Sequence, residues 1–299
     1  MVYTKGSTVN IYAVKEDTYG VCPASDQTHP TNILGRIITF NSPDSVSVEE
    51  IPSQGQRTRS DVVRTGHNVQ WDASVNLTAD MLGYLLGYTS MAKDEYSFSA
   101  LVKADSDKHL FTGSMIDTLS LSATNIGELV TADISCKARW HAVGTAQLKD
   151  ADGQTTLNEP NANTSDSGAP VTFNNQWKWK AGNGSYAVLN VKSWKLTVSE
   201  NLQAVAGLSA NANGFRLDNG QKSIPQALGI ELELTIQAGS SEWDARRTAF
   251  AKDLSFQLPI GGRTVTLTGC NLDAAGPTRQ SSGSYDETIK AVATTMTVA

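Results

Sequence analysis

Few residues of this chain have the types and the spacing that catalysis needs. Zinc sites place histidines a few residues apart or beside cysteines, and acid–base sites often rely on histidine. No two of the four histidines lie that close in the sequence, and none lies beside a cysteine at the spacing of zinc ligands. We therefore expect each of them to be a loop or surface residue. They are His29, His67, His109 and His141.

Two further motifs resemble ligand sites but lack an essential part. Asp150-Ala151-Asp152-Gly153 could open a calcium loop, but Glu159 comes too early to close it. Gly182-Asn183-Gly184 has no helical pattern after it that could bind phosphate at a helix N-terminus. Nucleophile-elbow and Walker motifs are absent from the sequence. We expect no metal site, no cofactor and no enzymatic activity.

Trp177 and Trp179 offer a possible binding chemistry. They occupy alternate positions of an expected strand, so they lie on one face of it. If exposed, they could stack on sugar rings, as in a carbohydrate-binding β-sandwich. If buried, they are core or subunit-interface residues. We favour the buried arrangement, and sugar binding remains the alternative function.

Composition limits the partners and the compartment. The net charge is −6, and a surface that binds phosphates would need clustered Lys and Arg. Cys22, Cys136 and Cys270 are odd in number and far apart, so we expect buried thiols and no disulfide framework. No apolar run reaches the length of a membrane helix, and residues 1–10 lack the pattern of a secretion signal. We expect no membrane partner and synthesis in the cytoplasm.

The pattern of elements that would position any site occurs twice in the sequence. Residues 69–77 and 230–236 alternate between apolar and polar side chains, as half-buried antiparallel strands do. Each is followed by a short helical pattern, a hairpin and a Thr-Gly turn. Three landmark pairs have nearly the same offset: Leu77 with Leu234, Phe98 with Phe256 and Asp117 with Asp273. We predict an internal duplication; the alternative is two generic β segments that share a turn motif.

The predicted fold is mainly β, with two tandem duplicated antiparallel β-sandwich or barrel modules, each with one short α-helix. The first module covers residues 1–144, a polar linker or insertion covers 145–170, and the second module covers 171–299. Two polar stretches, 42–68 and 200–221, hold corresponding places in the modules. They are long for structureless loops in a compact domain, so we expect them to be functional or mobile.

Short motifs in both halves carry a resemblance to a known family. Residues 14–21 read VKEDTYGV and resemble an E-x-T-Y-G-T start, with Val21 where Thr is common. Residues 193–199, SWKLTVS, resemble a characteristic strand before a polar loop. Residues 112–117 and then 119–122 resemble a turn followed by an S-L-S-L strand. By these motifs the chain resembles the tail tube proteins, also called major tail proteins, of long-tailed bacteriophages, in their two-module type.

The resemblance implies a structural role in a virion tail. Sheets of neighbouring modules would join into a barrel around a lumen, and three chains would complete a ring with pseudo-sixfold symmetry. Rings would stack into a tube that conducts DNA during ejection without binding it specifically. The implied partners are further copies of the chain, the tape measure protein, and the tail terminator or initiator proteins. Another virion β protein, or the tube of a contractile system, is a further alternative.

Two groups of residues are the candidates for these roles. Asp72, Glu231 and Glu233 lie on polar faces of expected strands, and we predict that they face the lumen, where acidic groups would repel DNA phosphates. The two polar stretches would form the ring-stacking contacts. The residues predicted to make those contacts are Gln54, Arg57, Arg59, Asn211 and Arg216.

Overall fold

The computed structural model describes the chain except for several segments. The described residues are 2–3, 9–23, 32–33, 36–43, 45–51, 61–87, 97–104, 107–144, 148, 170–174, 176–211, 214–224, 227–237, 253–279 and 285–299. Within them the fold is mainly β, as predicted, and all strand pairs are antiparallel.

The first half contains ten strands and one helix among its described residues. They are β1 (Val2–Tyr3), β2 (Val9–Lys15), β3 (Asn32–Ile33), β4 (Arg36–Asn41), β5 (Ser45–Ile51), β6 (Asp61–Asn76), α1 (Ala79–Gly87), β7 (Phe98–Ala104), β8 (Asp107–Ala123), β9 (Thr131–Ala138) and β10 (Trp140–Gly144). The strands of the second half are β11 (Trp177–Ala181), β12 (Ala187–Leu189), β13 (Val191–Ser199), β14 (Gln203–Asn211), β15 (Gly214–Ile224), β16 (Gly229–Gln237), β17 (Leu254–Ile260), β18 (Arg263–Arg279), β19 (Tyr285–Val292) and β20 (Thr295–Val298).

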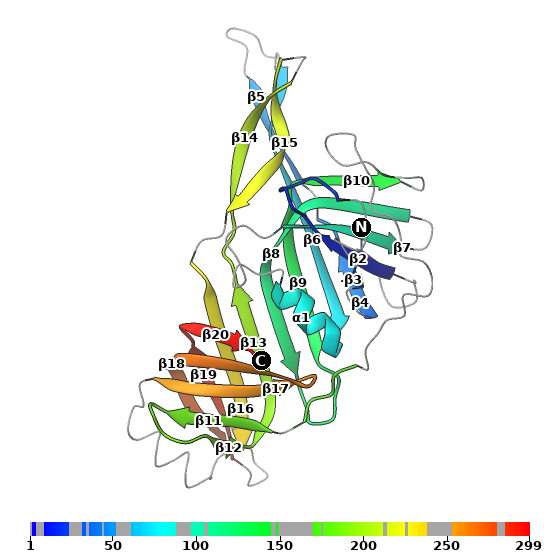
Figure 1. Ribbon diagram of the computed structural model, residues 1–299. Coiled ribbons are helices and arrows are strands. Elements are labelled where there is room, and N and C mark those ends of the chain that lie inside the picture. The colour runs from blue at the N-terminus through cyan, green and yellow to red at the C-terminus, as the bar shows by residue number, and fades with distance from the viewer. Residues whose placement is uncertain are drawn as a thin grey trace.

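One long sheet runs through both halves. Its strand order is β1–β4–β6–β9–β8–β13–β16–β19–β18. The halves meet where β13 pairs with the second part of β8, from Trp194 opposite Ala123 to Ser199 opposite Thr118. Hydrogen bonding across this pair makes a single continuous sheet of two halves that are far apart in sequence (Figure 1).

A second, smaller layer of strands packs on each half. In the first half it follows the order β3–β2–β7–β8–β10, and in the second β12–β11–β17–β18–β20. The long strands β8 and β18 belong to both layers, because their first parts pair in the small layer and their second parts in the long sheet. The apolar core fills the space between the layers in both halves.

The strand pairing of the first half recurs in the second, including its irregularities. The order β4–β6–β9–β8 matches β13–β16–β19–β18, and β2–β7–β8–β10 matches β11–β17–β18–β20. Three strand pairs of the first half have a register shift, and in each case the matching strand pair of the second half has one at the matching site. The matching shifts lie at Ile37/Thr39 and Val191/Ser193, at Phe98/Ala100 and Leu254/Phe256, and at Ile116/Thr118 and Leu272/Ala274.

This register corrects two of the three landmark pairs. Phe98 matches Leu254 at the bulge, and Phe256 matches Ala100, so Phe98 and Phe256 are not equivalent. Leu234 likewise matches Ala73 on β6 and not Leu77. The number of residues that separates matching positions is not constant along the two halves, because the connections between matching strands differ in length. The pair Asp117 and Asp273 does hold matching positions.

The predicted helix of the first half is present and amphipathic. It follows Thr78, whose side-chain oxygen accepts a hydrogen bond from the Met81 backbone N–H at 3.4 Å and caps the first turn. Its apolar face is buried in the core, as the spacing predicted. That face consists of Met81, Leu82, Leu85 and Leu86. The helical pattern predicted after residues 230–236 lies outside the described residues, as does most of the predicted linker 145–170.

The prediction that the two polar stretches 42–68 and 200–221 are loops was wrong, because much of each stretch forms a β-hairpin. β5 pairs with the first part of β6, and β14 pairs with β15, and the two hairpins lie together at one end of the molecule (Figure 1). Their backbone hydrogen bonds are made within the hairpins, so a strand can form there without the apolar alternation that a core-facing strand shows. The sequence lacked that alternation, and the loop prediction followed from its absence.

Candidate functional site

A polar surface extends across the outer face of the long sheet. Strands β6, β9, β13 and β16 alternate between buried apolar residues and more exposed, mostly polar ones. On β6, Trp71 and Ala73 are buried while Asp72 is partly exposed, and on β16 Leu232 is buried between the exposed Glu231 and Glu233. All three predicted lumen-facing residues therefore lie on this polar face.

Polar side chains form rows across the strands on this face. The strand register aligns residues of the two halves across the β8–β13 pair. One row contains Thr39, Ser74, Asp133, Ser120, Thr197, Glu231 and Val292. The next contains Asn76, Thr131, Ser122, Lys195, Glu233 and Lys290. The hydroxyl oxygens of Ser120 and Thr197 are 3.2 Å apart, so a hydrogen bond links the halves on the polar face.

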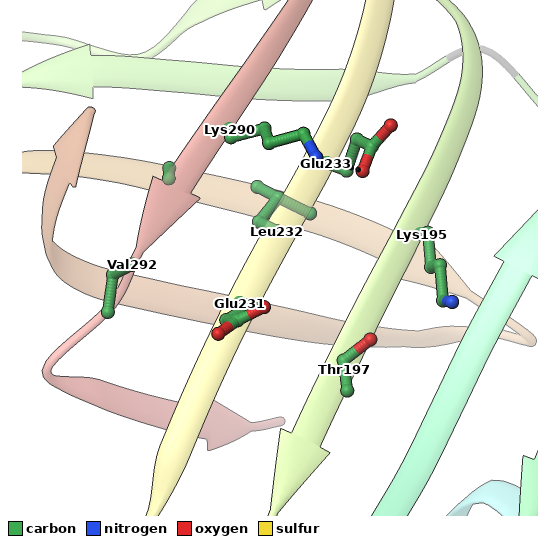
Figure 2. A pocket seen from close by; sticks show the side chains of 8 residues that line it. Lys195, Thr197, Glu231, Leu232, Glu233, Lys290 and Val292 are labelled. Carbon is green, nitrogen blue, oxygen red and sulfur yellow. Dashed lines mark ion pairs between the residues drawn. The ribbon is translucent and has the colours of Figure 1, made fainter. Parts of the chain in front are cut away.

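The charges on this face are mixed and not purely acidic, which corrects the expectation of an acidic surface. Lys290 Nζ lies 3.3 Å from Glu233 Oε2, and Lys195 lies opposite Glu233 on the other side. Figure 2 shows these side chains around a shallow depression over β13, β16 and β19. Asp72 lies on β6, with β9, β8 and β13 between it and β16, so the structure spreads the three carboxylates over the face.

A carboxylate at the junction of the halves fixes where the chain leaves β13. Asp117, in β8, accepts a hydrogen bond from the Leu202 backbone N–H to Oδ1 at 2.8 Å. Its backbone oxygen accepts another from the Glu200 N–H at 2.8 Å. Lys137 completes the arrangement, with Nζ 3.1 Å from Asp117 Oδ2 and 2.7 Å from the Leu202 carbonyl oxygen. These bonds hold the base of the β14–β15 hairpin against β8 and β9.

Comparison with known proteins identifies this architecture. The family model for phage tail tube proteins matches residues 6–294. The chain belongs to the phage tail tube protein family. No curated protein sequence matches it. The resemblance drawn from the short motifs is therefore confirmed over nearly the whole chain, and the protein is a structural component of a phage tail.

The E-x-T-Y-G motif of this tail tube protein has a clear structural role. Glu16 is 5% exposed, and its carboxylate accepts four hydrogen bonds. Oε1 accepts from Ser99 Oγ at 2.6 Å and from the Gly113 N–H at 2.8 Å, while Oε2 accepts from Ser97 Oγ at 2.7 Å and from the Gly20 N–H at 2.8 Å. The carboxylate thus ties the loop after β2 to β7 and β8. Burial raises the pKa of Glu16, and the four hydrogen bonds oppose that rise.

Sequence reasoning placed one histidine wrongly. His109 lies in β8 and is 4% exposed, and its ring stacks with those of Phe111 and His141. His109 Nδ1 lies 3.0 Å from His141 Nε2, so the two rings share a hydrogen bond. Cross-strand pairing of β8 with β10 brings them together across a long sequence separation, which spacing alone could not reveal. His29 lies outside the described residues, and only the backbone of His67 is described, in β6.

The aromatic and cysteine predictions are confirmed. Trp177 and Trp179 are each 1% exposed on β11 and face the core. Cys22, Cys136 and Cys270 are buried free thiols. Burial raises the pKa of Cys270 to about 12, and that of Cys136 is raised well above its usual value by burial and by nearby Asp72 and Asp117.

Within the described part of the chain, no group of His, Cys, Asp and Glu is arranged to hold a metal ion. No helix there is long and apolar enough to cross a membrane. Of the predicted stacking residues, Gln54, Arg57 and Arg59 lie outside the described residues. Asn211 ends β14 and Arg216 lies in β15, so both belong to the projecting hairpin.

Proposed function

We propose that three copies of this tail tube subunit close into a ring with pseudo-sixfold symmetry, and that the rings stack into a tube that conducts DNA during ejection. The observation that carries this proposal is the β8–β13 pair. It joins the two halves of one chain edge to edge, in a sheet whose last described strand in the second half is β18. Repeating the same junction between chains would close the sheet into a barrel without free edges.

We infer that residues 1–144 and 171–299 are two copies of one module, joined by 145–170. The coincidence of three register shifts supports this, since bulges are specific features of a strand pair. Two modules per chain and three chains would make six similar positions around the ring.

In this ring the polar face of the long sheet lines the lumen. Its hydroxyl-rich rows and interleaved Lys and carboxylate groups support passage of DNA without tight binding, because Lys290 pairs with Glu233, Lys195 lies opposite Glu233 and Lys137 pairs with Asp117. The hairpins β5–β6 and β14–β15 project together from one end, which supports a role in stacking for them and for the residues Asn211 and Arg216. The tape measure and the terminator or initiator proteins would meet the tube at its ends.

The burial of Trp177 and Trp179 removes the observation that favoured a sugar-binding module. We propose no catalytic role. The tube proposal is tested by electron microscopy of the purified protein, with light scattering on the same sample. We expect rings or tubes with threefold or pseudo-sixfold symmetry. A protein that stays monomeric under all conditions, together with virions whose tails lack such rings, would contradict it.

A further inference from the structure

The edge of β4 is already paired within the chain. β1 lies antiparallel to β4, with Val2 opposite Asn41 and Tyr3 opposite Phe40. Among the described residues, this two-residue strand is the last strand of the long sheet on the side of the first half. It is therefore the strand that any further strand added to β4 must replace.

The second half shows what lies beside the strand that matches β4. The matching register shifts in β4 and β13 make Phe40 equivalent to Trp194 and Asn41 equivalent to Lys195. On β13, Trp194 and Lys195 lie opposite Ala123 and Ser122 of β8. β1 thus takes, on β4, the same place and the same antiparallel direction that β8 takes on β13.

The strand that matches β8 ends the sheet at its other side. The second part of β18 pairs with β19 on one side, from Asn271 to Arg279. Among the described residues no strand pairs with its other side over 274–279, where the matching part of β8 pairs with β13. Transferring the register places Arg279 of one copy opposite Phe40 of the next, and Thr278 opposite Asn41.

We propose that β1 covers the β4 edge of the free subunit and is displaced by β18 of a second copy when the ring closes. This rests on the proposed ring. β1 makes two register pairs with β4, whereas the matching β8–β13 junction makes six, so the longer strand would replace the shorter one. A covered edge would also keep free subunits from pairing with unrelated strands before assembly.

A reversible disulfide between β1 and β4 tests this directly. Val2 and Asn41 are direct cross-strand partners, at a spacing that a disulfide can bridge. We expect the double variant Val2→Cys with Asn41→Cys to crosslink on mild oxidation, to lose ring formation by at least tenfold, and to recover it on reduction. Unchanged assembly of the crosslinked protein would overturn the proposal. Failure of the crosslink to form would also overturn it, because β1 would then not lie on β4.

A second disulfide, placed between β2 and β7, controls for the effect of a disulfide as such. Asn10 and Lys103 are direct partners in the β2–β7 pair, away from the sheet edge. The variant Asn10→Cys with Lys103→Cys is expected to assemble equally well oxidised and reduced.

Conversely, deletion of residues 2–5 uncovers β4, and we expect the initial assembly rate to rise severalfold. An unchanged or lower rate would overturn the proposal. Wild-type protein that forms no rings, in solution or in virions, would instead overturn the ring itself.

Discussion

Asp117 and Asp273 occupy the same position in the two halves of the chain. Each is the extra residue where a long strand shifts register against its neighbour, between Ile116 and Thr118 in β8 and between Leu272 and Ala274 in β18. Asp117 uses this position to bind the backbone of the chain leaving β13. In the proposed ring, the next subunit would supply the backbone that Asp273 binds, as the segment after β13 supplies it to Asp117.

Replacing the two aspartates should therefore have different effects. We expect Asp117→Ala to lower the free energy of unfolding by about 1–3 kcal/mol, because the partly buried Leu202 N–H and Lys137 lose their partner. Asp273→Ala should change subunit stability by less and reduce ring formation by more. Chemical denaturation and light scattering measure the two effects. Equal effects of both variants on both measurements would contradict the assignment of Asp273 to the subunit junction.

Glu16 should be one of the most sensitive buried polar residues. In Glu16→Gln the side-chain NH2 group would replace one carboxylate oxygen and point at a backbone N–H, either that of Gly20 or that of Gly113. Both groups are donors, and a backbone N–H cannot accept a hydrogen bond. We expect a loss of about 1–3 kcal/mol in the free energy of unfolding. Asp17→Asn, at the exposed neighbouring position, is the control and should change stability by less than about 0.5 kcal/mol. A variant at Glu16 as stable as wild type would mean that the four hydrogen bonds contribute little.

The pH dependence of that difference has a defined sign. Burial raises the pKa of Glu16 in the folded protein above its usual value of 4.5, so the folded state binds the proton more tightly than the unfolded state. The stability contributed by this group is then highest at low pH, and it falls as pH rises from about 4.5 through the raised pKa. Measuring wild type and Glu16→Gln across this range should show the wild type losing stability relative to the variant. A difference that grows with pH would show that the hydrogen bonds outweigh burial.

The sequence predicted the parts of the fold that face the core. The alternation on β6 and β16 and the short helix after β6 follow from local periodicity, and the structure contains them. The hairpin between β17 and β18 turns at Gly261-Gly262. Both turn glycines have positive φ, of 57° and 81°, as a two-residue turn requires.

The remaining features depend on pairing between distant segments, which local patterns do not encode. His109 meets His141 only because β8 pairs with β10. The polar side of the long sheet was correctly expected for Asp72, Glu231 and Glu233. Its mixed charge was missed, because Lys195 and Lys290 come next to Glu233 only through strand register.

The buried thiols give a test of packing in both halves. Because the pKa values of Cys136 and Cys270 are raised, little thiolate exists near neutral pH, and burial blocks access. We expect neither to react with a thiol reagent at pH 8 in the native protein, and all three cysteines to react in denaturant. Mass spectrometry of labelled peptides identifies the site. Rapid native labelling of Cys270 would show that the second half opens readily.

The charge balance of the polar face should control how DNA interacts with assembled tubes. Glu231→Lys with Glu233→Lys would leave Lys195 and Lys290 without their acidic partner and build a basic cluster over two neighbouring rows. Because these glutamates are exposed and exposed ion pairs contribute little, we expect the unfolding free energy to fall by at most about 1 kcal/mol. Tubes of this variant should retain short DNA fragments at low salt, with an affinity that falls steeply as salt rises, while wild-type tubes release them. Val188→Lys adds positive charge on β12, in the small layer, and serves as the control. Equal DNA retention by the control and by the glutamate variant would place the polar face away from the lumen.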